Sequence, residues 1–268
     1  MSEKRINLFG IFIDDLSLGE AMEKAHTALS GEGAISVFTP NLEILDGARR
    51  SDGIKRMLNT ADLSLPDGTG LRIVSALLGK TIKNTTPGID FGEELLCLCA
   101  KEEKRVFLLG GREGVAEKAA ENLRKKLPSL IICGTRDGYF HKNEVPNVCD
   151  GINASRAEVI IVCRGFPRQE SFVCEAKQYL PDIKIFACLG GSLNVWAEEV
   201  KRAPLPLCRA HLEWLWRISQ EPERIERFIY SLRTLLEALY VFLINIPRRI
   251  GIFEDMGAYN QVSKKSKP

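Results

Sequence analysis

The sequence predicts an α/β fold: a Rossmann-like, mostly parallel sheet covered by helices on both faces, with a C-terminal helical appendage. Three observations support this prediction. Short apolar runs alternate with segments of helical periodicity along the first 200 residues. Most of these runs end in Gly, Pro, Asn or Asp, as strands that lead into turns do. With 268 residues, 45% hydrophobic and 27% charged, the chain has the composition of an ordinary globular protein.

The first third of the chain begins with one or two short strands predicted at 5–15, around Gly10. Ser17 is expected to begin a helix that runs to about Ser30, because Glu20 stands at the capping-box position. The apolar run 34–39 predicts a buried strand, which Pro40 ends. The elements that follow are a helix at 41–50, a helix at about 53–60, a strand at 62–65 and a helix from about 71, with Leu71, Val74, Leu77 and Leu78 at helical spacing.

The same alternation continues over residues 88–189. The predicted elements are, in order, a helix at 88–103, a strand at 105–109, a helix at about 114–127, strands at 130–134 and 158–163, a helix at about 168–180 and a strand at 184–189. Strands that alternate with helices in this way are typical of a parallel sheet with helical crossovers. We therefore expect residues 1–200 to form a single catalytic α/β domain.

The character of the sequence changes after about Lys201. Between residues 201 and 249, nine Lys and Arg face five Glu, which leaves a net charge of +4. Residues 225–243 place apolar side chains at helical spacing, and 235–246 are almost wholly apolar. This stretch is too short to cross a bilayer but suits an amphipathic helix at a membrane surface; a terminal helix docked on the core is the alternative. We predict a basic amphipathic appendage at 201–256 and a disordered tail at 257–268.

Composition excludes several classes of protein. The formal net charge of +2 gives no reason to expect a nucleic-acid partner. The eight cysteines contain no C-x-x-C pair, so they predict reduced thiols rather than a zinc or redox site. The N-terminus has no apolar stretch of signal-peptide length, and no window reaches about 18 uninterrupted apolar residues. These observations favour a cytoplasmic protein.

Asp67 is the strongest candidate for chemistry. It follows the predicted strand 62–65 and Pro66, and it precedes Gly68 and Gly70, which permit a tight turn into the next helix. Ligands of open α/β sheets bind at the carboxyl ends of strands, where a carboxylate can act as a general base. The alternative is that Asp67 only caps the following helix.

Four further loops follow predicted strands and carry glycine or polar residues. They are 39–41 (Thr-Pro-Asn), 110–114 (Gly-Gly-Arg-Glu-Gly), 165–170 (Gly-Phe-Pro-Arg-Gln-Glu) and 190–192 (Gly-Gly-Ser). Glycine lets backbone N–H groups approach a phosphate, although each loop alone could be a plain strand-to-helix turn. Together with the Asp67 loop they favour a nucleotide or sugar site.

The sequence lacks G-x-G-x-x-G order at Gly110, a Walker loop, metal-ligand spacing among its histidines and a D-x-D pair after a strand.

These segments resemble the WecG/TagA/CpsF glycosyltransferases, glycosyltransferase family 26, over roughly residues 5–230. The matching runs are Thr39–Glu43, Leu65–Gly68, Pro87–Asp90, Val106–Gly111, Gly138–Phe140, Gly165–Glu170, Lys201–Pro204, Leu212–Arg217 and Glu221–Pro222. The resemblance implies an inverting, metal-independent enzyme without a cofactor. Such an enzyme moves N-acetylmannosamine or its uronic acid from UDP to a polyprenyl-diphosphate-linked sugar, in teichoic acid, common antigen or capsule synthesis. It implies peripheral attachment to the inner face of the cell membrane, and it leaves a homo-oligomer open.

The resemblance also implies roles for individual residues. Asp67 would be the general base, and Thr39 and Asn41 would hold the donor sugar or its phosphates. Gly110, Gly111 and Tyr139 would line the nucleotide pocket, and Gln169 would touch the sugar or the acceptor. Arg217, Arg224 and Arg227 would contact a diphosphate, of UDP or of the lipid carrier; a solvated basic stripe is the alternative for Arg224 and Arg227.

The chain departs from the family pattern at three positions. Thr85 stands where members usually carry arginine, Asn194 where they carry aspartate, and Arg164 where they carry an apolar residue. These departures bear on sugar identity rather than on the fold. Two other hypotheses remain from the residues: another nucleotide-dependent Rossmann-like enzyme, such as an oxidoreductase, and a non-catalytic sugar-nucleotide-binding protein.

Overall fold

The chain begins with a two-stranded antiparallel hairpin, β1 (Arg5–Leu8) and β2 (Ile11–Asp14), in a computed structural model that describes residues 5–31, 33–209, 213–220 and 225–249. Phe9 and Gly10 both have positive φ angles, 52° and 88°, at the turn. Two successive positive φ angles fit the twist of a tight hairpin. The expectation of short strands around Gly10 is therefore confirmed.

The main sheet has six strands, and every pair of neighbours is parallel. Its members are β3 (Ile35–Phe38), β4 (Leu63–Ser64), β5 (Arg105–Gly110), β6 (Ile131–Arg136), β7 (Val159–Cys163) and β8 (Ile185–Cys188), in the order β4-β3-β8-β7-β5-β6. β5 connects outward to β6 whereas β7 connects in the opposite direction to β8. In an open α/β sheet, such a divergence marks the ligand crevice at the carboxyl ends of the strands.

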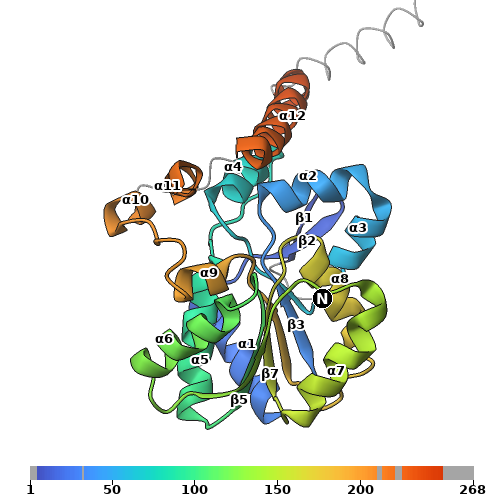
Figure 1. Cartoon of the computed structure of the whole chain (residues 1–268). Helices are drawn as coiled ribbons and strands as arrows, with labels where there is room; N and C mark the ends of the chain where they lie inside the picture. Colours follow the sequence, from blue (N-terminus) through green and yellow to red (C-terminus); the bar gives the residue numbers. More distant parts are fainter. Residues whose placement is uncertain (1–4, 32, 210–212, 221–224, 250–268) are drawn as a thin grey trace, which may run out of the picture.

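Helices cover both faces of this sheet, as predicted (Figure 1). One apolar layer is formed with α1 (Leu18–Ser30), α5 (Gly88–Lys101), α6 (Val115–Lys126) and α9 (Ser192–Trp196). The other is formed with α2 (Leu42–Arg50), α3 (Asp52–Leu58), α4 (Thr69–Leu77), α7 (Val145–Ala154) and α8 (Arg168–Ala176). The central strands are buried on both sides, which is why they read as continuous apolar runs.

Several boundaries differ from the sequence prediction. The strand expected at 62–65 is only the two-residue β4 at the edge of the sheet, and the helix expected to reach 180 ends at Ala176. A short 3₁₀ turn, Lys142–Glu144, and α7 were not predicted. The segment of α7 contains Pro146 and Gly151, which obscure its helical periodicity, but Pro146 lies in the first turn, where its missing N–H costs nothing.

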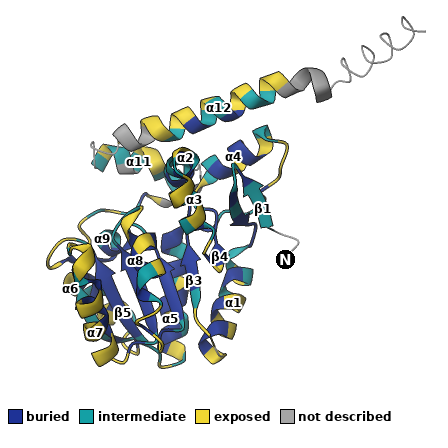
Figure 2. Cartoon of the chain, turned by 90° about the vertical axis from the view of Figure 1, so that its right-hand side faces the viewer, coloured by how far each residue is buried: buried dark blue, intermediate teal, exposed yellow. Residues whose placement is uncertain are grey.

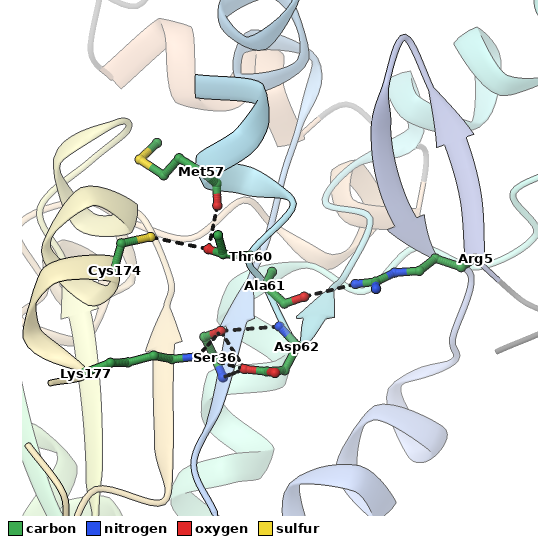
Figure 3. A network of polar contacts seen from close by, with 8 residues as sticks. All are labelled: Arg5, Ser36, Met57, Thr60, Ala61, Asp62, Cys174 and Lys177. Atoms are coloured by element: carbon green, nitrogen blue, oxygen red, sulfur yellow. Dashed lines mark hydrogen bonds and ion pairs between the residues drawn. The ribbon is translucent and has the colours of Figure 1, made fainter. Parts of the chain in front are cut away.

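A polar network near the start of β3 fixes the register of the β4 edge (Figure 3). Asp62 Oδ2 accepts hydrogen bonds from the backbone N and Oγ of Ser36, both at 2.8 Å, and forms an ion pair with Lys177 at 2.9 Å. Burial alone would raise the pKa of Asp62, but the hydrogen bonds from Lys177 and Ser36 outweigh it and lower the pKa. Arg5 donates to the carbonyl of Ala61. The chain therefore enters β4 in one fixed register.

Beyond residue 201 the structure describes α10 (Leu205–Arg209), α11 (Glu213–Gln220) and α12 (Ile225–Arg249). α12 lies across α2 and α4 (Figure 2). Its docked side includes Thr234 and Ala238, both fully buried, and Thr234 donates to Asp46 of α2. Among the described helices, none is both long enough and apolar enough to cross a bilayer. The tail expected at 257–268 lies outside the described residues.

Candidate active site at the carboxyl edge of the sheet

The loops at the carboxyl ends of β4 and β3 are joined directly by backbone hydrogen bonds. Asp67 N donates to Pro40 O at 2.9 Å, and Thr86 N donates to Pro66 O at 2.8 Å. The first bond places Asp67 beside the Thr39–Asn41 loop. The second places the segment that leads to α5 beside Pro66. Asp67 is half-buried, and the N-cap residue of α4 is Gly68, so Asp67 lies just before the helix rather than at its cap.

Thr39 and Asn41 make different contacts in the neighbouring loop. Thr39 is 5% exposed, and its Oγ1 donates to Cys188 O, at the end of β8, at 3.0 Å. A Cβ added to Gly88 would lie 3.0 Å from Thr39 Oγ1, so the start of α5 packs directly on Thr39. Asn41 is the N-cap of α2, with its Oδ1 accepting from Ile44 N at 3.0 Å. Both residues therefore help to build the loop that borders Asp67.

Gln169 joins the loops that follow β7 and β8. Its Oε1 accepts a hydrogen bond from Gly190 N at 3.1 Å, and its Nε2 donates to Glu170 Oε1 at 2.8 Å. Gln169 is 2% exposed and Glu170 is completely buried. Burial raises the pKa of Glu170 to about 7; the hydrogen bond from Gln169 opposes this shift and the charge of Glu43 adds to it.

Gly110 ends β5 and Gly111 begins the loop that follows; both have positive φ angles, 142° and 73°. A Cβ on Gly110 would lie 2.3 Å from Cys163 O, so only glycine fits between β5 and β7. Gly111 N donates to Cys163 O, and Gly138 N donates to Gly111 O at 2.9 Å. The Gly138 loop therefore rests on the glycine pair and carries the 64% exposed Tyr139 above the ends of β5 and β6.

Three arginines surround this loop. Arg164 donates to the carbonyls of Gly138 and Phe140, and its guanidinium lies 3.5 Å from the centre of the Phe140 ring. Arg136 lies over the same ring, and Arg168 lies 5.6 Å from the Tyr139 ring centre. Burial, followed by repulsion from Arg168, lowers the pKa of Arg164 to about 10, so the group stays charged at neutral pH. This end of the crevice is therefore positively charged.

The thiols at the ends of β7 and β8 are poor candidates for a nucleophile. Burial raises the pKa of Cys163 to about 12 and that of Cys188 well above its ordinary value. A neutral buried thiol behaves as a small apolar side chain. All eight cysteines are free, as expected from their spacing.

The structure thus brings the predicted residues of the core to one edge of the sheet, in the order Asp67, Thr39 and Asn41, Gln169, Gly110 and Gly111, and Tyr139. The side chains of Arg217 and Arg227, and the whole of Arg224, lie outside the described residues. Sequence reasoning gave no role to Glu170, which stands in the matching run Gly165–Glu170, or to Arg164, which it named only as a departure from the family pattern. The missing signal was burial, which a sequence motif does not contain.

Comparisons with known proteins cover most of the chain. The model of the glycosyl transferase WecG/TagA/CpsF family matches residues 6–249. A Bacillus spizizenii protein, N-acetylglucosaminyldiphosphoundecaprenol N-acetyl-beta-D-mannosaminyltransferase, is 32% identical over 229 residues, which cover 85% of this chain and 88% of that relative. A Bacillus subtilis strain 168 protein of the same name is 31% identical over 209 residues, 76% of this chain and 80% of the relative.

Proposed function

Because this chain belongs to the WecG/TagA/CpsF family and is a glycosyltransferase, we propose that it transfers N-acetylmannosamine from UDP to N-acetylglucosamine on diphosphoundecaprenol. The acceptor and the transferred sugar are those in the names of both relatives. UDP as the donor, inversion at the anomeric carbon and transfer without a metal are further parts of the proposal. The observation that carries it is the row of predicted site residues along one sheet edge.

The order of the strands supports a linear arrangement of the donor along this edge. Asp67 follows β4, Thr39 follows β3, Gln169 follows β7 and Gly110 ends β5. Neighbouring strands lie about 4.8 Å apart, so the four steps from β4 to β5 span about 19 Å. Such a span suits an extended nucleotide-diphosphate sugar. The nucleotide would lie at the glycine loop and the sugar near Asp67.

In this arrangement Asp67 acts as the general base. Its carboxylate takes the proton of the acceptor hydroxyl while that oxygen attacks the anomeric carbon, and the bond to the UDP oxygen breaks on the opposite side. A single displacement of this kind inverts the anomeric centre. The charge that develops on the leaving diphosphate needs fixed cations or backbone N–H groups. Arg164 and Arg168 supply positive charge at the nucleotide end of the crevice. We propose that Arg217, Arg224 and Arg227 contribute at the diphosphate.

The lipid-linked acceptor requires the site to face a membrane, and we propose that α12 provides the contact. Its docked side rests on α2 and α4, whose first turns lie beside Asn41 and Asp67. Many of its other residues are exposed (Figure 2), and several of these are apolar. These include Ile225, Ile229, Leu232, Leu236, Leu239 and Leu243, each 39–56% exposed. The helix is docked on the core, and in this proposal its exposed side contacts the membrane.

The test is a transfer assay with the full-length protein, UDP-N-acetylmannosamine and a prenyl-diphosphate-linked N-acetylglucosamine. We expect a disaccharide lipid with inverted anomeric configuration, formed equally with and without a chelator. UDP-N-acetylglucosamine and the uronic acid donor serve as comparison substrates. Absence of product from every donor, with the folded protein shown to bind none of them, would overturn the proposal.

A further inference from the structure

Glu170 is an ionisable group buried beneath the loops that follow β7 and β8. It lies in the first turn of α8 and is completely shielded from solvent. Its Oε1 accepts a hydrogen bond from Gln169 Nε2, and its Oε2 has no hydrogen-bond partner among the residues that the structure describes. Burial of a carboxylate with an unpartnered oxygen is costly, so this group calls for a structural or functional explanation.

The surroundings of Glu170 favour the protonated form. Burial has the largest effect on the pKa of Glu170, and Glu43, from α2, adds a negative charge; in turn, burial and the charge of Glu170 raise the pKa of Cys188, at the end of β8. Burial therefore raises the pKa of Glu170 to about 7 despite the hydrogen bond from Gln169. The protonation state of this carboxyl group changes near neutral pH, next to Gln169 of the proposed donor site.

Glu170 also decides which way the amide of Gln169 faces. Oε1 of Gln169 must face Gly190 N–H, because a reversed amide would set two donors against each other. Glu170, an acceptor on the other side, favours the same orientation. Gly190 lies two residues after Cys188, whose carbonyl binds Thr39. The amide therefore links the loop after β7 to the loop after β8, and through β8 to Thr39.

We propose that Glu170 is a positioning residue for the transfer reaction: its carboxyl group holds the Gln169 amide in one orientation and thereby fixes the loop after β8. In the protonated form the group orients Gln169 without adding charge. In the ionised form it places a negative charge close to the proposed site of the donor diphosphate and weakens donor binding. The effect on the reaction rests on the function proposed above, whereas the effect on Gly190 does not.

The experiment compares the full-length wild type with Glu170→Gln and Glu170→Ala, using UDP as the probe at pH 6 and pH 8. Glu170→Gln keeps an acceptor for Gln169 and removes the titration. Relative to this variant, we expect wild-type affinity for UDP to fall roughly tenfold between the two pH values, as one added like charge at short range implies. The titration of UDP itself is common to both proteins. Glu175→Gln, later on the same helix, is the matched control and should follow the wild type.

Kinetics and hydrogen exchange separate positioning from a merely structural role. For Glu170→Gln we expect near wild-type kcat and a donor KM with less dependence on pH. Glu170→Ala should lose on the order of tenfold or more in kcat/KM at both pH values. Without nucleotide, the Gly190 amide should exchange faster in Glu170→Ala and at the wild-type rate in Glu170→Gln.

A wild-type pH dependence in Glu170→Gln, or unchanged Gly190 exchange in folded Glu170→Ala, would overturn the inference. Failure of the wild type to bind UDP would overturn only the proposed function and leave the exchange result to decide the positioning role.

Discussion

The hydroxyl group of Thr39 donates a 3.0 Å hydrogen bond to the carbonyl oxygen of Cys188, and so ties β3 to β8 at the middle of the carboxyl edge. Both residues are buried, and Gly88 packs against the same hydroxyl group. The hydroxyl proton of Thr39 is therefore used in a hydrogen bond that holds the loops of the site together. We therefore expect Thr39 to contribute to the reaction mainly through the geometry of the loop that carries Asn41.

Replacement of Thr39 by valine tests this geometry. Valine has a similar shape but leaves the buried Cys188 carbonyl without its donor, which costs about 1–3 kcal/mol. We expect the free energy of unfolding in urea to fall by this amount and transfer to fall with it. Thr39→Ser, which keeps the donor, should retain most of both. Equal stability of the valine variant and the wild type would show that the bond contributes nothing.

Asp67→Asn tests the general base. The amide cannot take the acceptor proton, so we expect kcat to fall on the order of a hundredfold or more, as loss of general-base catalysis does. UDP affinity, measured by calorimetry, should change little because the backbone contacts of the loop remain. Wild-type transfer by the variant would remove this mechanism.

The close approach of β5 and β7 predicts a large effect of Gly110→Ala. The added Cβ would lie 2.3 Å from Cys163 O, at a φ of 142° that alanine rarely adopts. We expect destabilisation of at least about 3 kcal/mol by urea unfolding, since neither backbone segment can yield cheaply. Gly151→Ala is the control, because no atom lies near its added Cβ within α7. There we expect stabilisation of about 0.5–1 kcal/mol.

Glu170 predicts a pH dependence of stability with a defined sign. Its pKa rises from 4.5 in the unfolded chain to about 7 in the fold, so the folded state binds more protons between these values. Stability from this group is full below about pH 4.5 and is lost as pH rises to about 7, by about 3 kcal/mol in total. The difference in unfolding free energy between Glu170→Gln and the wild type should therefore grow in favour of the variant across this range. A constant difference would contradict a shifted pKa.

The exposed side of α12 predicts membrane binding that is separable from folding. Replacement of Leu236, Leu239 and Leu243 by serine removes apolar surface that is 39–55% exposed. Each leucine contributes at most about 1.5–3 kcal/mol when an apolar phase buries it. We expect binding to anionic vesicles, measured by sedimentation, to fall at least a hundredfold while Tm changes little. Unchanged sedimentation would remove α12 as the contact. Ala238→Leu, on the docked side, should have the opposite pattern: Tm should fall while binding to vesicles changes little.

The sequence by itself determined the alternation of strands and helices, the parallel sheet and the loops that carry the predicted site residues. These follow from local periodicity and turn chemistry, as the buried runs of β5 and β7 and the capping box at Ser17 illustrate. The helix α7 was not predicted because Pro146 and Gly151 obscure its helical periodicity. Its stability comes mainly from the packing of its apolar face on the sheet.

Only the tertiary structure decided the order of the strands, and with it which loops meet. Asp67 and Thr39 are neighbours because β4 pairs with β3, and Thr39 reaches Cys188, 149 residues away, because β8 pairs with β3 on its other side. The state of Glu170 was equally hidden, since the pKa of a carboxyl group depends on the solvent and charges that the fold removes or brings near. Local sequence specifies elements, whereas pairing and burial are properties of contacts between residues distant along the chain.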